Sequence, residues 1–151
     1  MKMTLKQQLY SKCKAFIDHR LLTIKNNIRD IEQGLLSETK SSAGDKHETG
    51  RAMLQLEREK TGQQLANIQN QFGLLSRINP ETTTNTVALG SLVFTTQFNY
   101  FIAISAGKIE VGEQSFFAIS AATPIGKLLL SKTKGDSFKF RQQDIMILKI
   151  M

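Results

Sequence analysis

The strongest constraint on this sequence is a repeat of apolar residues in its N-terminal half. From residue 4 to residue 38 there is no proline and only one glycine, Gly34, and apolar side chains recur at alternating spacings of three and four. The repeat consists of Ile17, Leu21, Ile24, Ile28, Ile31 and Leu35. This alternation predicts one long helix with a heptad seam. A seam this narrow needs a partner to cover it.

The same repeat returns over residues 50–76, where it predicts a second helix. Its positions are Leu54, Arg58, Thr61, Leu65, Ile68, Phe72 and Leu75. The short connection favours an antiparallel hairpin between the two helices. In an antiparallel pair of helices, the numbers of facing residues add to a constant. Leu35 with Leu54 gives 89, Ile17 with Phe72 gives 89, and the four seam pairs between these two give the same sum. The predicted apex therefore lies between Gly44 and Asp45.

Two of the predicted pairs place a polar residue in the seam, Ile31 with Arg58 and Ile28 with Thr61. We therefore expect the hairpin to be packed less tightly toward its tip than at its base. Helices of about 30 residues would make a stalk on the order of 45 Å long. A thin hairpin buries little surface per residue, so stability alone is a poor explanation for its length. A better explanation is that the hairpin carries its tip to a distant site.

The remainder of the chain lacks this helical repeat and has a different sequence pattern. Residues 77–86 contain Pro80 and show no apolar periodicity, so we interpret them as a linker between a hairpin of residues 1–76 and a C-terminal domain of residues 87–151. Thr123 and Pro124 are typical of the start of a short helix, as N-cap and first helical residue. Short β-rich runs surround this helix, at 87–95, 98–105, 115–119, 137–140 and 145–150. The predicted fold class is α+β, with a long hairpin and a small antiparallel sheet carrying one helix.

Most of the aromatic residues belong to the C-terminal domain. Phe94, Phe98, Tyr100, Phe101, Phe116, Phe117 and Phe138 have the spacing of strand residues, which favours core positions over a ligand pocket. The one cysteine, Cys13, excludes an internal disulfide, and we expect it to be buried in the first helix.

The chain is basic, with 20 Lys and Arg against 13 Asp and Glu and a formal charge of +7. An excess of this size suits a polyanionic partner such as RNA or a nucleoprotein assembly. No stretch approaches the roughly 20 apolar residues that span a bilayer, and the first residues lack the apolar segment of a signal peptide. We therefore expect a cytoplasmic protein that does not bind membranes, and we expect a monomer.

Two segments resemble one known family. Gly44-Asp45-Lys46-His47-Glu48 matches the Gly-Asp-x-x-Glu motif that the Gre family of bacterial transcript-cleavage factors carries at its hairpin tip. Residues 122–136, with Thr123-Pro124-Ile125 and Gly135-Asp136, are similar to a segment of that family's C-terminal domain, and residues 87–93 are similar to that domain's first strand. The resemblance covers nearly the whole chain and implies a coiled-coil hairpin with an acidic tip near residues 41–50, followed by an FKBP-like domain.

The family's members bind RNA polymerase, insert the hairpin into its secondary channel and promote cleavage of backtracked RNA. The resemblance implies that Asp45 and Glu48 help to hold a catalytic Mg²⁺ jointly with the polymerase, so the protein would be an accessory factor and not an enzyme by itself. Magnesium prefers hard oxygen ligands and is usually held by one or two carboxylates together with phosphate oxygens. Lys40, Lys46, His47 and Arg51 would then lie where nucleic acid passes.

Other interpretations of the tip remain open. Asp45 and Glu48 also have the spacing of a helix capping box. For the basic residues, the alternative is that they are solvated and have no fixed role. The family's motif continues with an acidic residue where this chain has Arg51. We consider three functions: a transcript-cleavage factor, a regulator that occupies the secondary channel without cleavage, and an RNA- or ribosome-binding protein on the same scaffold. The positive charge favours the third function, because many Gre factors are acidic.

Overall fold

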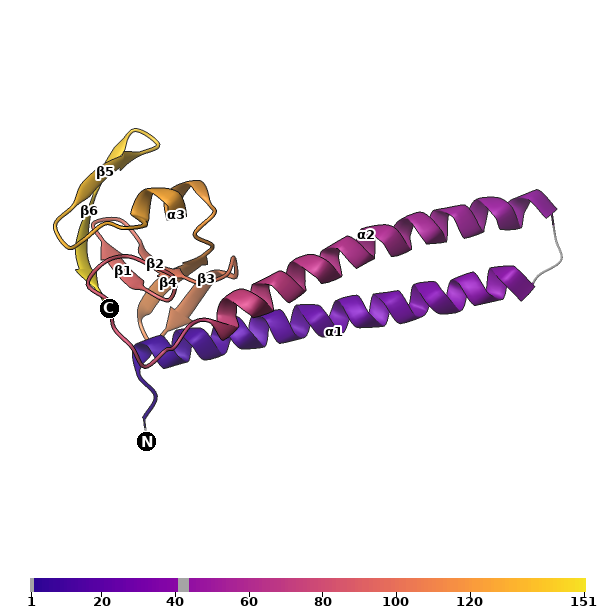
Figure 1. The fold of residues 1–151 in the computed structure, drawn as a ribbon, viewed down its shortest axis with the longest axis horizontal. Helices are drawn as coiled ribbons and strands as arrows, with labels where there is room; N and C mark the ends of the chain where they lie inside the picture. The colour runs from indigo at the N-terminus through magenta and orange to yellow at the C-terminus, as the bar shows by residue number, and fades with distance from the viewer. Residues whose placement is uncertain (1, 41–43) are drawn as a thin grey trace. The chain divides into compact units, whose positions relative to one another are not determined.

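The computed structural model describes residues 2–40 and 44–151, with side chains for residues 2–38 and 48–151. Two long helices, α1 (Leu5–Lys40) and α2 (Gly44–Ser76), precede six strands and a short helix, α3 (Pro124–Leu129) (Figure 1). The strands are β1 (Leu92–Thr95), β2 (Asn99–Ile102), β3 (Gly107–Val111), β4 (Gln114–Ile119), β5 (Ser137–Phe140) and β6 (Gln143–Ile150). The predicted α+β class is confirmed. No helix in the described part of the chain is long and apolar enough to cross a membrane.

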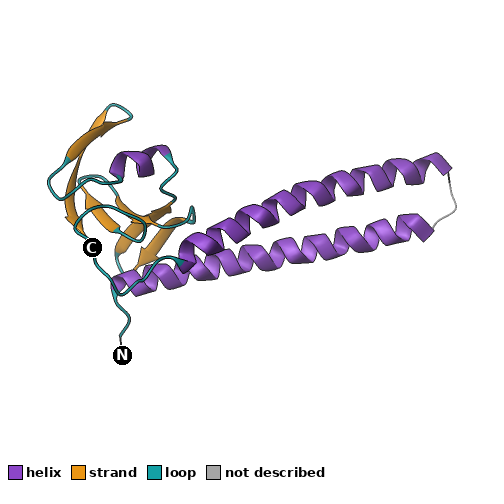
Figure 2. Ribbon diagram, in the orientation of Figure 1, coloured by secondary structure: helices purple, strands orange, loops and turns teal. Residues whose placement is uncertain are grey.

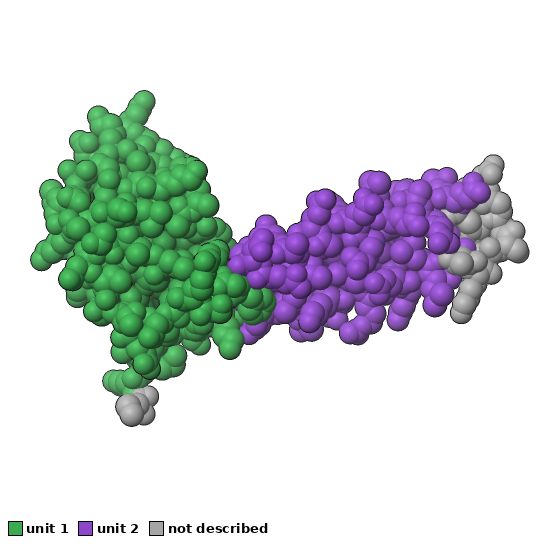
Figure 3. Space-filling model, viewed as in Figure 1, with its two compact units in different colours: residues 1–16, 72–151 green, residues 17–71 purple. Residues whose placement is uncertain are grey.

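By packing, the chain divides into two compact units (Figure 3). One unit, residues 17–71, is the larger part of the helical hairpin, and we call it the hairpin unit. The other combines residues 1–16 with residues 72–151, and we call it the sheet unit. This division is based on contacts between residues. The domain boundaries predicted near residues 76 and 87 are based on secondary structure, so they stay a prediction.

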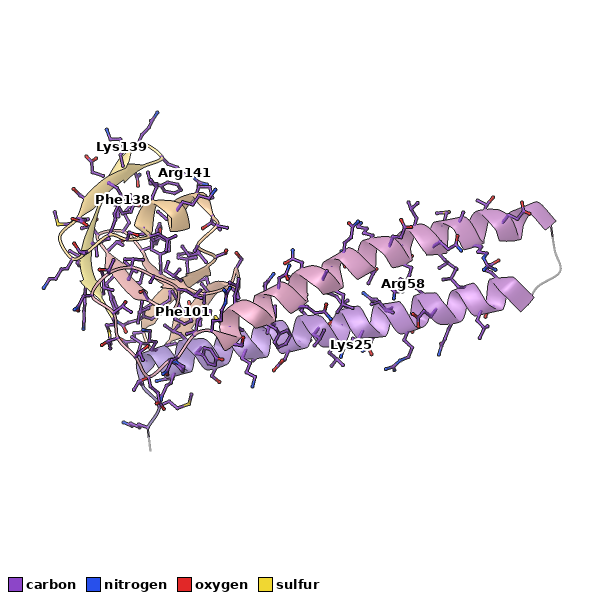
Figure 4. All side chains as sticks on the ribbon, in the orientation of Figure 1. Lys25, Arg58, Phe101, Phe138, Lys139 and Arg141 are labelled. Carbon is purple, nitrogen blue, oxygen red and sulfur yellow. The ribbon has the colours of Figure 1, made fainter. Side chains whose placement is uncertain are left out.

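Within the hairpin unit, the heptad seam forms the core. Ile17, Ile24 and Ile31 of α1 and Ile68 of α2 are buried, while most residues between the seam positions are exposed. The contacts between the helices follow the predicted register to within one residue. Arg58 Nε lies 3.5 Å from Glu32 Oε1, with Arg58 extending from α2 toward α1 (Figure 4), and the Leu54 side chain covers Gly34.

Burial along the seam does not fall steadily toward the tip, so the expected looser packing there stays a prediction. Leu35 and Leu54 are half-buried, but so are Leu21 and Leu65 nearer the base, and Ile31 is buried. The polar residues in this stretch are satisfied locally, because the buried Thr61 donates a hydrogen bond of 2.8 Å to the backbone oxygen of Glu57. On the outside, Met53 and Leu56 are about two-thirds exposed, at 69% and 71%.

The strands, drawn in orange in Figure 2, form one sheet with the order β3-β4-β2-β1-β6-β5. Neighbouring strands are antiparallel except for β2 and β4, which pair in parallel with Tyr100 opposite Phe117. The prediction of a purely antiparallel sheet is corrected at this one pair. The cause is β3, which reverses the chain at the sheet edge, so that β4 returns in the same direction as β2 and lies beside it.

Strand β3 was missing from the predicted elements. Gly112 lies in the turn after it, with a φ of 62°. Gly107, however, is the first residue of the strand itself. Between them Lys108 and Glu110 are exposed, and charged side chains are common on an edge strand because they discourage pairing with other chains.

One buried cluster of the sheet unit lies between the sheet and α3. Val93, Tyr100, Ile102 and Ile147 of the strands form one buried cluster with Ile125 and Leu129 of α3. The predicted start of α3 is confirmed, since Pro124 is its first residue and the Thr123 hydroxyl accepts a hydrogen bond of 3.1 Å from Gly126 N. Most of the aromatic residues are buried or half-buried as expected. Phe98 is the exception, with 52% of its surface exposed.

A buried lysine joins three distant parts of the chain within the sheet unit. Lys6, at the start of α1, is 5% exposed, and its Nζ donates to the backbone oxygens of Thr82 at 2.7 Å and of Met151 at 3.2 Å. Burial lowers the pKa of this amine, because the charged form loses its water. The segment predicted to be a linker is therefore attached at Thr82 to the rest of the unit.

Candidate functional site at the hairpin tip

The tip residues singled out in the sequence lie at the start of α2, except for Lys40, which is the last residue of α1. This helix begins at Gly44, six residues before the predicted start, so Asp45 and Glu48 both lie on helical backbone. Residues three apart on a helix are neighbours on one face. The side chains of Lys40, Asp45, Lys46 and His47 lie outside the described residues, so the distance between the two carboxylates and their use as ligands stay predictions.

The start of α2 also bears on the capping interpretation. Asp45 is one residue inside the helix, whereas a capping residue precedes it. Within the first turn, a negative charge is stabilised by the positive end of the helix dipole. A helix start is therefore a suitable place for an acidic pair with or without a metal ion.

Glu48 and Arg51 are the two candidate residues whose side chains the structure describes. Both are exposed. They are also three residues apart, so Arg51 follows Glu48 on the same face of α2. A positive charge in this position reduces the negative potential that the two carboxylates would present to a cation.

Gly50 leaves room for the Glu38 side chain of α1 just below the tip. A β-carbon at this position would lie 3.2 Å from Glu38 Oε1 of α1, which is tighter than ordinary contact. Beside this contact an open groove of about 630 Å³ runs along α2, lined mainly by Met53, Leu54 and Leu56 with Glu57 and Lys60. The tip is thus followed by an exposed apolar surface of the kind that contacts other macromolecules.

Two carboxylates on one helix face are a minimal set of hard oxygen donors, and they suit Mg²⁺ only when further ligands come from elsewhere. Among the side chains that the structure describes, no group of three or more His, Cys, Asp and Glu residues could hold a metal ion. The predicted shared Mg²⁺ at Asp45 and Glu48 therefore stays a prediction.

Comparisons with known proteins add no relative: a scan against models of protein families finds no match, and a search of curated proteins finds no similar sequence. The resemblance to the Gre family accordingly rests on the segments quoted above.

Sequence reasoning missed two residues of the sheet unit, Tyr100 and Arg141, which line a small apolar pocket. Tyr100 was expected only as a core residue. Arg141 and Gln142 form the two-residue turn that joins β5 to β6. The sequence signal for this turn was the position of Arg141 between two β-rich runs. Phe138, Lys139 and Arg141 mark this β-hairpin in Figure 4.

Proposed function

We propose that this protein is a Gre-like transcription elongation factor that binds RNA polymerase and presents the tip of its helical hairpin in the secondary channel. One observation carries the proposal: the Gly-Asp-x-x-Glu motif coincides with the start of α2, directly after the connection between the two helices. The register contacts between Glu32 and Arg58 support the same apex. If Asp45 and Glu48 served only to cap a helix, the length of the hairpin would have no explanation.

At the tip, Asp45 and Glu48 would hold Mg²⁺ together with groups of the polymerase and the RNA. The ion would supply an activated water and stabilise the leaving oxygen of the phosphodiester. The chain's own part is to position the two carboxylates and, through Lys40, Lys46, His47 and Arg51, to attract the RNA backbone. Phosphate contacts of this kind position nucleic acid without reading its sequence.

The test is RNA shortening in stalled, backtracked complexes of RNA polymerase from the organism that encodes the chain. We expect the purified protein to increase the rate of shortening. The double variant Asp45→Ala, Glu48→Ala should lose this increase, while its binding to polymerase and its helical content stay unchanged. No increase at any magnesium concentration would exclude the cleavage function.

A matched control removes two acidic residues from the exposed surface of the hairpin away from the tip. Asp30→Ala with Glu59→Ala changes the net charge by the same amount as the tip variant. This control should retain the full stimulation. Equal losses in both double variants would show that overall charge, and not the tip, is responsible.

A second candidate is a regulator that occupies the channel without cleavage. Arg51 favours it, because the family's motif has an acidic residue at this place, and the exposed Arg51 follows Glu48 on α2. Binding to polymerase without RNA shortening would select this function. In that case Arg51→Glu should restore some cleavage, because it returns the acidic residue to the motif.

The positive charge of the chain favours a third candidate function, that of an RNA- or ribosome-binding protein. Residues 1–79 hold 13 basic and 8 acidic residues, so most of the excess of +7 lies in the N-terminal half. Recovery of ribosomes and not polymerase with the tagged chain from its native cell would support this candidate. Such binding should weaken steeply as salt rises, because phosphate contacts release counterions.

A further inference from the structure

The sheet unit contains a pocket that takes no part in the proposed hairpin function. It has a volume of about 270 Å³ and opens to solvent between β2, β4, α3 and the β5–β6 turn. Apolar side chains form most of its wall, chiefly Phe98, Phe117, Ile119 and Ile125. Phe98 meets Phe117 edge to face, with ring centres 5.3 Å apart, and is still half exposed. An exposed aromatic ring at the mouth of an apolar pocket is a suitable contact for an apolar ligand group.

Tyr100 adds a hydrogen-bonding group to this apolar wall. The residue is 6% exposed, and among the described residues the buried side-chain polar atom without a hydrogen-bond partner is Gln71 Oε1, so the Tyr100 hydroxyl is open to the pocket. There it can donate a hydrogen bond to water or to a ligand. Burial raises the pKa of the Tyr100 phenol, and the positive charge of Arg141 partly opposes the rise. At neutral pH the hydroxyl is therefore protonated and able to donate.

Arg141 supplies the charge at the rim. Its guanidinium lies over the Phe140 ring, 5.1 Å from the ring centre. Arg141 and Gln142 have φ angles of 49° and 67°, so both occupy the left-handed region in a two-residue β-turn. Such a turn favours asparagine and glycine, and other residues there are strained. An arginine in a strained turn beside a phenol that is open to the pocket is consistent with a binding role.

We propose that this pocket binds an acidic peptide segment in which a large apolar side chain lies next to a carboxylate. The apolar side chain enters between Phe98, Phe117 and Ile125. The carboxylate accepts a hydrogen bond from the Tyr100 hydroxyl and pairs with the Arg141 guanidinium. The requirement for a negative charge follows from Arg141, and the requirement for an apolar group follows from the wall.

Size and shape favour a peptide over other ligands. Pockets for drug-sized molecules usually enclose about 300–1,000 Å³, so this one accommodates a single side chain and its neighbour. The pocket is open, as a segment that continues on both sides requires. Nucleic acid would need several cations along a backbone track, whereas Arg141 is the one cationic residue that lines this pocket.

The test titrates the full chain with short blocked peptides and follows backbone amide shifts by NMR. The probe is acetyl-Ser-Phe-Glu-Ser-amide, and the matched probes replace its Glu with Gln or its Phe with Ala. We expect the first probe to shift amides around Phe98, Phe117 and Arg141. Each matched probe should bind about tenfold more weakly, the difference expected for a lost charged hydrogen bond or a lost buried ring.

Three variants separate the roles of the pocket residues. Arg141→Gln should remove the preference for Glu over Gln, and Tyr100→Phe should weaken binding of both peptides. Lys139→Gln is the matched control, because Lys139 is a neighbouring cation that is exposed on β5 and does not line the pocket. Its binding should equal that of the unchanged chain. Arg141→Asn should weaken binding while raising the melting temperature, since asparagine suits the turn.

Three results would overturn the proposal. One is equal binding of the Glu and Gln peptides, or shifts only outside the pocket. Another is binding of free 3-phenylpropionate more tightly than the peptide, which would assign the pocket to a small carboxylic acid. The third is displacement of the peptide by a uridine oligonucleotide with a steep salt dependence, which would assign it to RNA. None of these results depends on RNA polymerase, so the hairpin function is tested separately.

Discussion

Among single residues, Cys13 shows how burial decides the chemistry of a side chain. It lies on α1 within the sheet unit and is fully buried. Burial raises the pKa of its thiol from 9.0 to about 12. The thiolate is the reactive form of cysteine, so the folded protein holds this residue in its inert form.

We therefore predict that Cys13 resists alkylation in the folded chain. At pH 8 the thiolate fraction is about a thousandfold below that of an ordinary cysteine, and reagents also lack access. Iodoacetamide labelling followed by mass spectrometry should show almost no reaction until denaturant unfolds the chain. Rapid labelling without denaturant would contradict the burial of Cys13.

The same residue makes stability depend on pH in a defined direction. Because the folded pKa lies above the unfolded value, unfolding releases a proton once the pH exceeds about 9. The stability associated with this thiol is complete below that pH and is lost as the pH rises toward 12. Cys13→Ala removes this contribution, so its melting temperature should fall less steeply over that range.

Among the elements, α3 depends on a glycine that its sequence does not make obvious. Gly126 is buried, and an added β-carbon would lie 2.4 Å from the backbone oxygen of Ser120. The Thr123 hydroxyl and the Ala121 α-carbon are also within 3.0 Å of that position. The capping turn before α3 can therefore approach the helix only because residue 126 has no side chain.

Gly126→Ala should destabilise the protein by about 2 kcal/mol or more, because backbone has to move to relieve the overlap. Gly73→Ala is the matched control, since nothing lies within 4 Å of a β-carbon there. Inside α2, alanine should stabilise by about 0.5–1 kcal/mol through helix propensity. Urea denaturation measures both, and equal effects of the two substitutions would contradict the close contact at Gly126.

At the scale of the whole molecule, long-range contacts bring together segments that local sequence does not connect. In the sheet unit, Lys6 links the start of α1 to Thr82 and to Met151. Met151 is held in turn by two backbone hydrogen bonds with Leu92, at 3.0 and 2.8 Å. The N-terminal helix, the segment before the sheet and the last residue therefore form one connected structure.

Lys6→Met should lower the free energy of unfolding by about 1–3 kcal/mol, because the backbone oxygens of Thr82 and Met151 lose a charged donor. The exposed residue Lys12 offers the control, and Lys12→Met should change stability by less than about 0.5 kcal/mol. Hydrogen exchange should also rise around Thr82 in the first variant only. An unchanged midpoint of unfolding for Lys6→Met would show that its two hydrogen bonds contribute nothing.

Sequence alone determined the elements that follow from local periodicity. The apolar repeat from Ile17 to Leu35 specified α1, its partner repeat in α2 and the register that Glu32 and Arg58 confirm. Thr123 and Pro124 likewise specified the start of α3. These features depend on residues a few positions apart, or on one short connection, so a pattern in the sequence can report them.

Only the tertiary structure decided the strand order, the parallel pairing of β2 with β4, the burial of Lys6 and the pocket between Tyr100 and Arg141. Each depends on contacts between residues far apart in the chain. A strand shows its two faces in its sequence but does not show its neighbours. For that reason Phe98, whose spacing is that of a core residue, lies half exposed at the mouth of a pocket instead.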